Sequence, residues 1–74
     1  MDLELLAARL VQAEERVVEG AKYIAEQSAF VAALERNVGD TTTARQLLAH
    51  LAAMQPMHVA ERDQLKRELA ANDN

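Results

Sequence analysis

Apolar residues in the first half of the chain recur at alternating intervals of three and four. Eleven positions follow this alternation between Leu3 and Val38, and nine of them are apolar. They are Leu3, Leu6, Leu10, Ala13, Val17, Gly20, Ile24, Gln27, Val31, Leu34 and Val38. Such a heptad seam is typical of a long amphipathic helix that lies against a partner helix. We therefore predict one helix over about residues 2–37.

The pattern breaks at residues 37–43, which read Asn-Val-Gly-Asp-Thr-Thr-Thr. Gly39 suits the left-handed position that follows a helix, and Asp40 and Thr41 are both good N-caps for the next one. We predict a turn over residues 38–41. Two long helices joined by so short a connection should lie antiparallel.

The second helix is predicted over about residues 41–70, followed by a frayed tail over 71–74. Its seam is less regular than the first and reads Ala44, Leu47 or Leu48, Leu51, Met54, His58, Glu61 or Arg62, Leu65 and Leu69. Pro56 removes one backbone hydrogen bond and crowds the preceding turn. This predicts a kink near Ala52–Gln55, or a break with the helix restarting at Pro56. The kink is favoured because the apolar periodicity resumes in phase beyond it.

Length and composition predict one small all-α domain over residues 1–74. The chain has fifteen alanines, ten leucines, two glycines and one proline, which favours helix over strand. A chain this short buries too little apolar surface for a wide stability margin and usually needs further stabilisation. It has no cysteine, so oligomerisation is the common stabilising device that remains.

The first helix carries more apolar surface than one partner helix can cover. Val11, Val18, Ala25 and Ala32 recur seven apart beside the seam. Tyr23 and Phe30 recur at the same interval on the other flank. A wide apolar face predicts more than one packing partner, and a second copy of the chain would complete a twofold four-helix bundle. The predicted association residues are Val11, Val18, Tyr23, Ala25, Phe30 and Ala32; the alternative is a monomeric hairpin with an alanine-rich outer surface.

Two polar residues interrupt the seams. Folding the hairpin about residue 40 places His58 near Tyr23 and brings Met54 opposite Gln27. Gln27 and His58 are therefore predicted to form a polar core layer, which can fix register and oligomeric state. The alternative is a metal ion held by His58 and Glu61 across a twofold axis. No other metal-ligand spacing occurs, so neither metal nor cofactor is expected.

Charge and motifs narrow the function classes. The net charge of −4 divides into −3 over residues 1–38 (four basic, seven acidic) and −1 over 39–74 (four basic, five acidic), without a polybasic tract. The longest apolar run, residues 29–34, is far shorter than the roughly 20 residues that span a bilayer. The acidic start is unlike a signal peptide, so we expect a soluble, cytoplasmic protein. No paired catalytic groups and no glycine-rich phosphate loop occur, so we expect a non-enzyme.

A nucleic-acid regulator is the alternative function. A helical-hairpin dimer resembles in architecture the plasmid copy-number regulator Rop, which binds paired RNA loops. Here Arg9, Arg16 and Phe30 lie on one flank of the first helix and would double into a basic strip in a twofold dimer. Glu15 and Glu19 interleave with that strip and would repel phosphate, so nucleic-acid binding is not favoured.

A pattern spread over residues 10–69 resembles uncharacterised two-helix proteins of rhizobia-like alphaproteobacteria. Its elements are Arg16-x-x-x-Gly20, Leu34-Glu35-Arg36-x-x-Gly39-x-Thr41, Leu47-Leu48-Ala49 and His58-x-x-x-Arg62-Asp63-x-Leu65. The resemblance implies a helical hairpin in a bacterial cytosol, and Pro56 departs from the pattern. Together with the apolar faces, it predicts a non-enzymatic interaction or assembly protein that associates with itself or docks to a protein partner.

Overall fold

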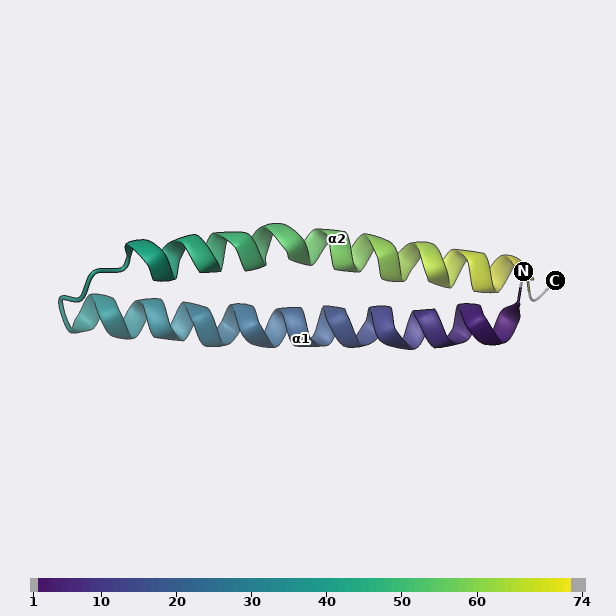
Figure 1. Cartoon of the computed structure of the whole chain (residues 1–74), viewed down its shortest axis with the longest axis horizontal. Helices are drawn as coiled ribbons and strands as arrows, with labels where there is room; N and C mark the ends of the chain where they lie inside the picture. The colour runs from purple at the N-terminus through teal and green to yellow at the C-terminus, as the bar shows by residue number, and fades with distance from the viewer. Residues whose placement is uncertain (1, 73–74) are drawn as a thin grey trace.

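The chain folds as a hairpin of two long helices. The structure is a computed structural model that describes residues 2–72, with α1 over Leu3–Arg36 and α2 over Thr42–Asn72. No strand occurs within the described residues. The two helices run antiparallel, so the start of α1 and the end of α2 share one end of the rod (Figure 1). The predicted all-α helical hairpin is confirmed.

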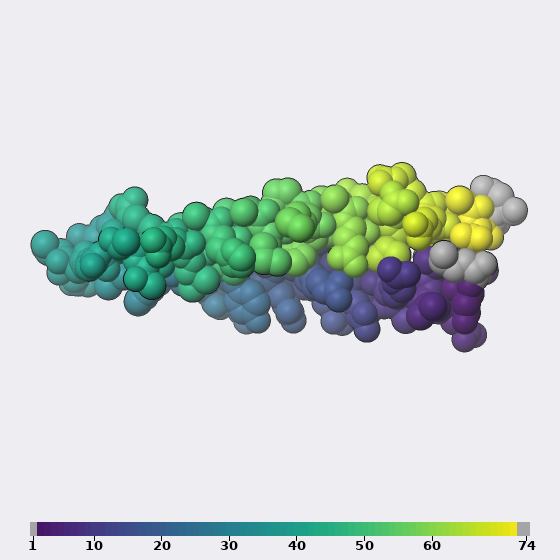
Figure 2. Space-filling view, turned by 45° about the horizontal axis from the view of Figure 1, so that its top comes forward, coloured from purple at the N-terminus to yellow at the C-terminus, as the bar shows by residue number. Residues whose placement is uncertain are grey.

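The hairpin is a thin rod with principal extents of 57 × 14 × 14 Å. Side chains of α1 and α2 meet along its length (Figure 2). Helix α2 includes residues 71 and 72, which we predicted to fray, whereas residues 73 and 74 lie outside the described part. A rod only two helices thick buries one stripe of each helix and exposes the rest.

The seam predicted for α1 is the stripe that faces α2. Leu6, Ala13 and Val31 are buried, and every other seam position between residues 10 and 34 is half-buried. Only the two ends of the seam, Leu3 and Val38, are exposed. The three-four alternation therefore identifies the packed face of α1 correctly.

The packed face of α2 follows the same alternation more strictly than expected. It consists of Ala44, Leu48, Leu51, Gln55, His58, Arg62, Leu65 and Leu69, all buried or half-buried. At the two ambiguous positions, Leu48 and Arg62 face α1, while Leu47 and Glu61 are exposed. The alternation also passes through Gln55, next to the Met54 that we had placed on the seam.

Helix α2 continues through Pro56 without interruption. The alternative in which the helix breaks and restarts at Pro56 is therefore wrong. Pro56 is exposed, so its ring lies on the side of α2 away from the packed face. A kink near residues 52–55 stays a prediction.

The end of α1 differs from expectation at the left-handed residue. Val38, not Gly39, has the positive φ, at 56°. The Gly39 N–H donates to the Leu34 carbonyl at 2.8 Å and the Val38 N–H donates to the Glu35 carbonyl at 3.3 Å, the pairing of a Schellman motif. At Gly39 space is limited instead, because a Cβ there would lie 3.1 Å from Leu34 Cδ2, and the leucine side chain would have to shift slightly.

The side chain of Asp40 satisfies a backbone N–H at the start of α2. Its Oδ1 accepts the backbone N–H of Thr42 at 2.9 Å. This backbone hydrogen bond, together with one from the Thr42 side chain, lowers the pKa of the Asp40 carboxyl below its ordinary value of 3.8. A carboxylate near a helix N-terminus also interacts favourably with the helix dipole.

Candidate association surface

The terminal half of the hairpin, residues 3–16 and 58–72, has a closed apolar core. Leu6 is 0% exposed, Ala13 1% and Leu65 3%, and Leu10 and Leu69 pack against them. These side chains come from both helices and form one buried cluster. The apolar seam residues of the terminal half are therefore covered within a single chain.

An ion pair lies on one flank of this core. Arg16 Nη1 is 3.2 Å from Glu61 Oε1, with the two side chains 47% and 46% exposed. An exposed pair of this kind contributes roughly 0–1 kcal/mol to stability. Its main consequence is that both side chains are occupied by a partner on the other helix.

The turn half, residues 17–57, is held together differently. Only Val31 and Ala44 are buried in it. Gln27 Nε2 donates to the Ala44 carbonyl at 3.0 Å, and Gln55 Nε2 donates to the Val17 carbonyl at 2.8 Å. Amide side chains therefore bridge the two helices where larger apolar contacts would otherwise close the seam.

Gly20 provides the space that Gln55 occupies. A Cβ on Gly20 would lie 1.9 Å from Gln55 Oε1, so no larger residue fits beside the amide as it stands. Gln55 Oε1 is buried without a hydrogen-bond partner among the described residues.

Two apolar grooves open between the helices on one side of the turn half. The larger, of about 430 Å³, is lined by Gln27, Phe30, Leu34, Asp40, Thr43, Ala44 and Leu47. The smaller, of about 130 Å³, is lined by Arg16, Glu19, Gly20, Tyr23, Leu51, Met54 and His58. We call Tyr23, Phe30, Leu47 and Met54, which border these grooves, the groove face. Tyr23, Phe30 and Leu47 are 48%, 53% and 47% exposed.

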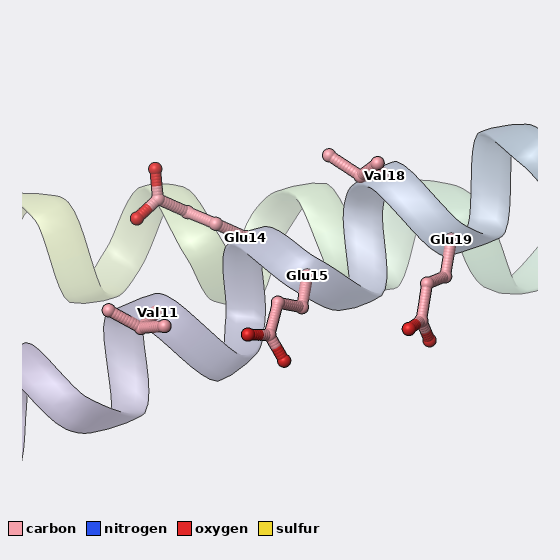
Figure 3. A pocket seen from close by; sticks show the side chains of 5 residues that line it. All are labelled: Val11, Glu14, Glu15, Val18 and Glu19. Atoms are coloured by element: carbon pink, nitrogen blue, oxygen red, sulfur yellow. The ribbon is translucent and has the colours of Figure 1, made fainter.

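A second exposed apolar surface lies on α1 alone. Val11 and Val18 are 54% and 69% exposed, and with Glu14, Glu15 and Glu19 they line a shallow trough of about 420 Å³. Figure 3 shows the three carboxylates projecting around the two valines. We call these five residues the acidic face.

The six predicted association residues do not form one continuous surface. Tyr23 and Phe30 belong to the groove face, whereas Val11 and Val18 belong to the acidic face. Val18 and Phe30 are separated by roughly 120° around the helix, at about 100° per residue. The two remaining residues, Ala25 and Ala32, are exposed and half-buried respectively.

The contribution of α2 to the groove face was not predicted from the sequence. Leu47 and Met54 lie seven residues apart beside the α2 seam, as Tyr23 and Phe30 do beside the α1 seam. This shared seven-residue spacing could have indicated that α2 also borders the grooves. The sequence left Leu47 and Leu48 as alternatives for one seam position, so it did not show which of them lies beside the seam.

The two residues of the predicted polar layer are half-buried but lie in different grooves. Gln27 lines the larger groove and is bound to the Ala44 carbonyl, whereas His58 lines the smaller one beside Tyr23. Gln27 therefore reaches the Ala44 backbone instead of lying opposite Met54. A helical carbonyl points towards the C-terminus of its helix, so the Ala44 oxygen lies nearer to Gln27 than its Cα does.

The side chains considered for nucleic-acid binding and for metal binding contact each other in the hairpin. Arg16, the central cation of the possible nucleic-acid strip with Arg9 and Phe30, is paired with Glu61. Glu61 was also the carboxylate considered with His58 as a metal ligand. Within residues 2–72, no three His, Asp or Glu side chains gather as metal ligands would.

Comparisons with known proteins add no family. No family model, curated protein or solved structure matches this chain at a significant level. Neither helix has, within residues 2–72, an apolar stretch sufficient to cross a membrane. What the chain can do must therefore be argued from its own surfaces.

Proposed function

We propose that the chain is a non-enzymatic helical assembly module of the cytoplasm that works through helix–helix contacts and forms a homodimer. In this dimer two hairpins pack as a four-helix bundle. The proposal accounts for the apolar side chains that a single hairpin leaves exposed on α1 and α2.

The exposed surface of the hairpin is the observation that carries this proposal. The chain exposes 5294 Å², whereas a compact monomer of its 8.2 kDa exposes about 4,500 Å². The excess, roughly 750 Å², is close to the about 800 Å² that each partner buries in a standard protein–protein interface. Covering one side of the rod with a second copy would remove an excess of this size.

The composition of the buried core supports the same proposal. Leu6 is the one large side chain that is fully buried among the described residues. A core this small seldom stabilises a chain of this length without further support. The sequence has no cysteine, and residues 2–72 hold no cluster of metal-ligating side chains. Association with a second copy is a support that the chain's own residues can supply.

We also propose that Pro56 kinks α2 near residues 52–55. Pro56 has no backbone N–H, so the Ala52 carbonyl, four residues earlier, lacks its helical partner. A bend at this point would lie within the turn half, beside the grooves, and would adjust the curvature of α2 to a bundle.

Light scattering across about a hundredfold range of protein concentration tests the proposed function. We expect a mass near twice 8.2 kDa at the upper concentrations, falling towards the monomer on dilution. A monomeric mass over the whole range would overturn the proposal.

A further inference from the structure

We infer that the second copy packs on the groove face, with the turns of the two hairpins at the same end of the bundle. This inference rests on the proposed dimer and specifies both which exposed apolar face is covered and how the two copies are oriented. Val11, Glu14, Glu15 and Val18 of the acidic face then stay outside the bundle, while Glu19, which also lines the smaller groove, lies at the edge of the interface.

Charge distinguishes the two faces. In a twofold interface a patch meets its own copy. The acidic face would bring Glu14 and Glu15, together with Glu19, which also lines the smaller groove, against the same three carboxylates. None of the ion pairs within residues 2–72 involves these three side chains, so burying them would add both repulsion and an uncompensated desolvation cost.

The grooves beside the groove face are lined by charged side chains of both signs. Arg16 lies beside Glu19 and is paired with Glu61, and the other charged side chain lining the grooves is Asp40, at the edge near the turn. The side chains between these charges are apolar or neutral. A second copy can therefore cover this face at a lower electrostatic cost than the acidic face.

The groove face also gives access to the unfinished part of the core. Leu34, Leu51 and Met54 are seam or near-seam residues that line the grooves and remain half-buried. Aromatic and aliphatic side chains from a second copy would complete their burial and remove further apolar surface from water. Gln27 and His58 would enter the bundle interior by the same step.

The distribution of residues along the groove face sets the orientation. Its apolar members lie in the turn half, whereas the Arg16–Glu61 pair lies in the terminal half. If both turns are at the same end, Tyr23 and Phe30 of one copy face Leu47 and Met54 of the other. In a fully overlapped dimer with the turns at opposite ends, these apolar side chains would lie against the ion pair of the other copy. Less apolar surface would then be buried against apolar surface, and the charged side chains would lose contact with water.

Spin-label distances in the full-length dimer test the orientation. The chain has no cysteine, so Val38→Cys at the turn and Ala8→Cys in the terminal half each give one label per copy. Both sites are exposed. We expect both distances to fall below about 30 Å, because packed helices lie about 8–10 Å apart and the labels add their own length.

Longer distances would overturn the orientation. Full antiparallel overlap would separate the two Val38 labels by nearly the rod length of 57 Å. A half-overlapped antiparallel dimer would bring the turns closer but move the Ala8 labels much further apart. A short Ala8 distance is therefore the diagnostic result.

Two matched substitutions test the face. Phe30→Glu and Val18→Glu each introduce one carboxylate at an exposed apolar position of α1. We expect Phe30→Glu to raise the dimer dissociation constant at least ~10-fold, because a charge would be buried without a partner, and Val18→Glu to change it less than about threefold. Circular dichroism of each variant verifies that the hairpin remains helical.

The reverse order of effects would overturn the choice of face. A dimer that Val18→Glu dissociates and Phe30→Glu leaves intact would place the second copy on the acidic face. Such a dimer would leave the proposed function standing. A monomeric wild-type chain would instead remove the proposed function itself, so the two failures are distinguishable.

Discussion

The two halves of the hairpin meet the same packing requirement in different ways. The terminal half closes its seam with Leu6, Ala13 and Leu65. The turn half bridges its helices with the amides of Gln27 and Gln55 and leaves apolar side chains beside open grooves. The terminal half therefore supplies the apolar core of the single hairpin, while the turn half leaves apolar side chains exposed, which we propose a second copy covers.

Removing the core of the terminal half should have the largest effect on the stability of the hairpin. Leu6→Ala deletes a side chain that is 0% exposed and should lower the free energy of unfolding by about 3 kcal/mol. Leu5→Ala is the matched control. Leu5 is adjacent to Leu6 in the sequence but is 54% exposed, so its substitution should cost less than about 0.5 kcal/mol. Urea unfolding followed by circular dichroism measures both. Equal effects would show that the terminal half has no closed core.

The boundary between the halves can be probed at Gly20 and Gln55. Gly20→Ala should gain up to about 1 kcal/mol of helix propensity, but its Cβ would displace the Gln55 amide from the Val17 carbonyl. We therefore expect little or no stabilisation from Gly20→Ala in the wild-type background, and about 1 kcal/mol in a Gln55→Ala background. A double-mutant cycle measures this coupling. Additive effects would contradict the role assigned to Gly20.

The tip of the turn half stores local strain at Val38. A β-branched residue in the left-handed region costs about 1–2 kcal/mol, and the 93% exposed side chain offers little packing in return. Val38→Gly should therefore stabilise the hairpin by about 1 kcal/mol net of the added chain entropy. Val38→Ala keeps the Cβ and should gain less. A glycine variant no more stable than the wild type would argue against the left-handed conformation.

The smallest effect is expected from the cap of α2 in the same half. Because the pKa of Asp40 is lowered in the folded state, its stabilisation is present above about pH 4 and is lost as the pH falls through the folded-state pKa. Asp40→Asn cannot ionise, so its Tm should change less than that of the wild type between about pH 5 and about pH 2. Identical pH profiles would exclude a contribution from this carboxylate.

Much of the fold could be predicted because a long three-four alternation fixes which side of a helix is packed. That pattern identified the α1 seam and, with the short break after Asn37, the hairpin. The left-handed residue was misplaced from Val38 to Gly39. The Schellman pairing depends on where α1 ends to within one residue, and sequence does not fix helix ends that closely.

The candidate surface was harder to predict, because it depends on how α2 is rotated against α1. Consecutive residues point about 100° apart on a helix, so the choice between Leu47 and Leu48 decides what borders the grooves. Without that rotation, Val18 and Phe30 both looked like exposed apolar residues of one helix. Their separation into an acidic face and a groove face emerges only when the second helix is in place. The reach of Gln55 across to Val17 is likewise a property of the pair of helices.

The dependence of the melting temperature on protein concentration tests the central claim most directly, which is that the turn half is completed by a second copy. A dimer that dissociates on unfolding gains stability with concentration by mass action. We predict that the Tm of the wild type rises by several degrees across about a hundredfold concentration range, while that of Phe30→Glu stays nearly constant. A wild-type Tm independent of concentration, with the light-scattering mass of a monomer, would contradict the account.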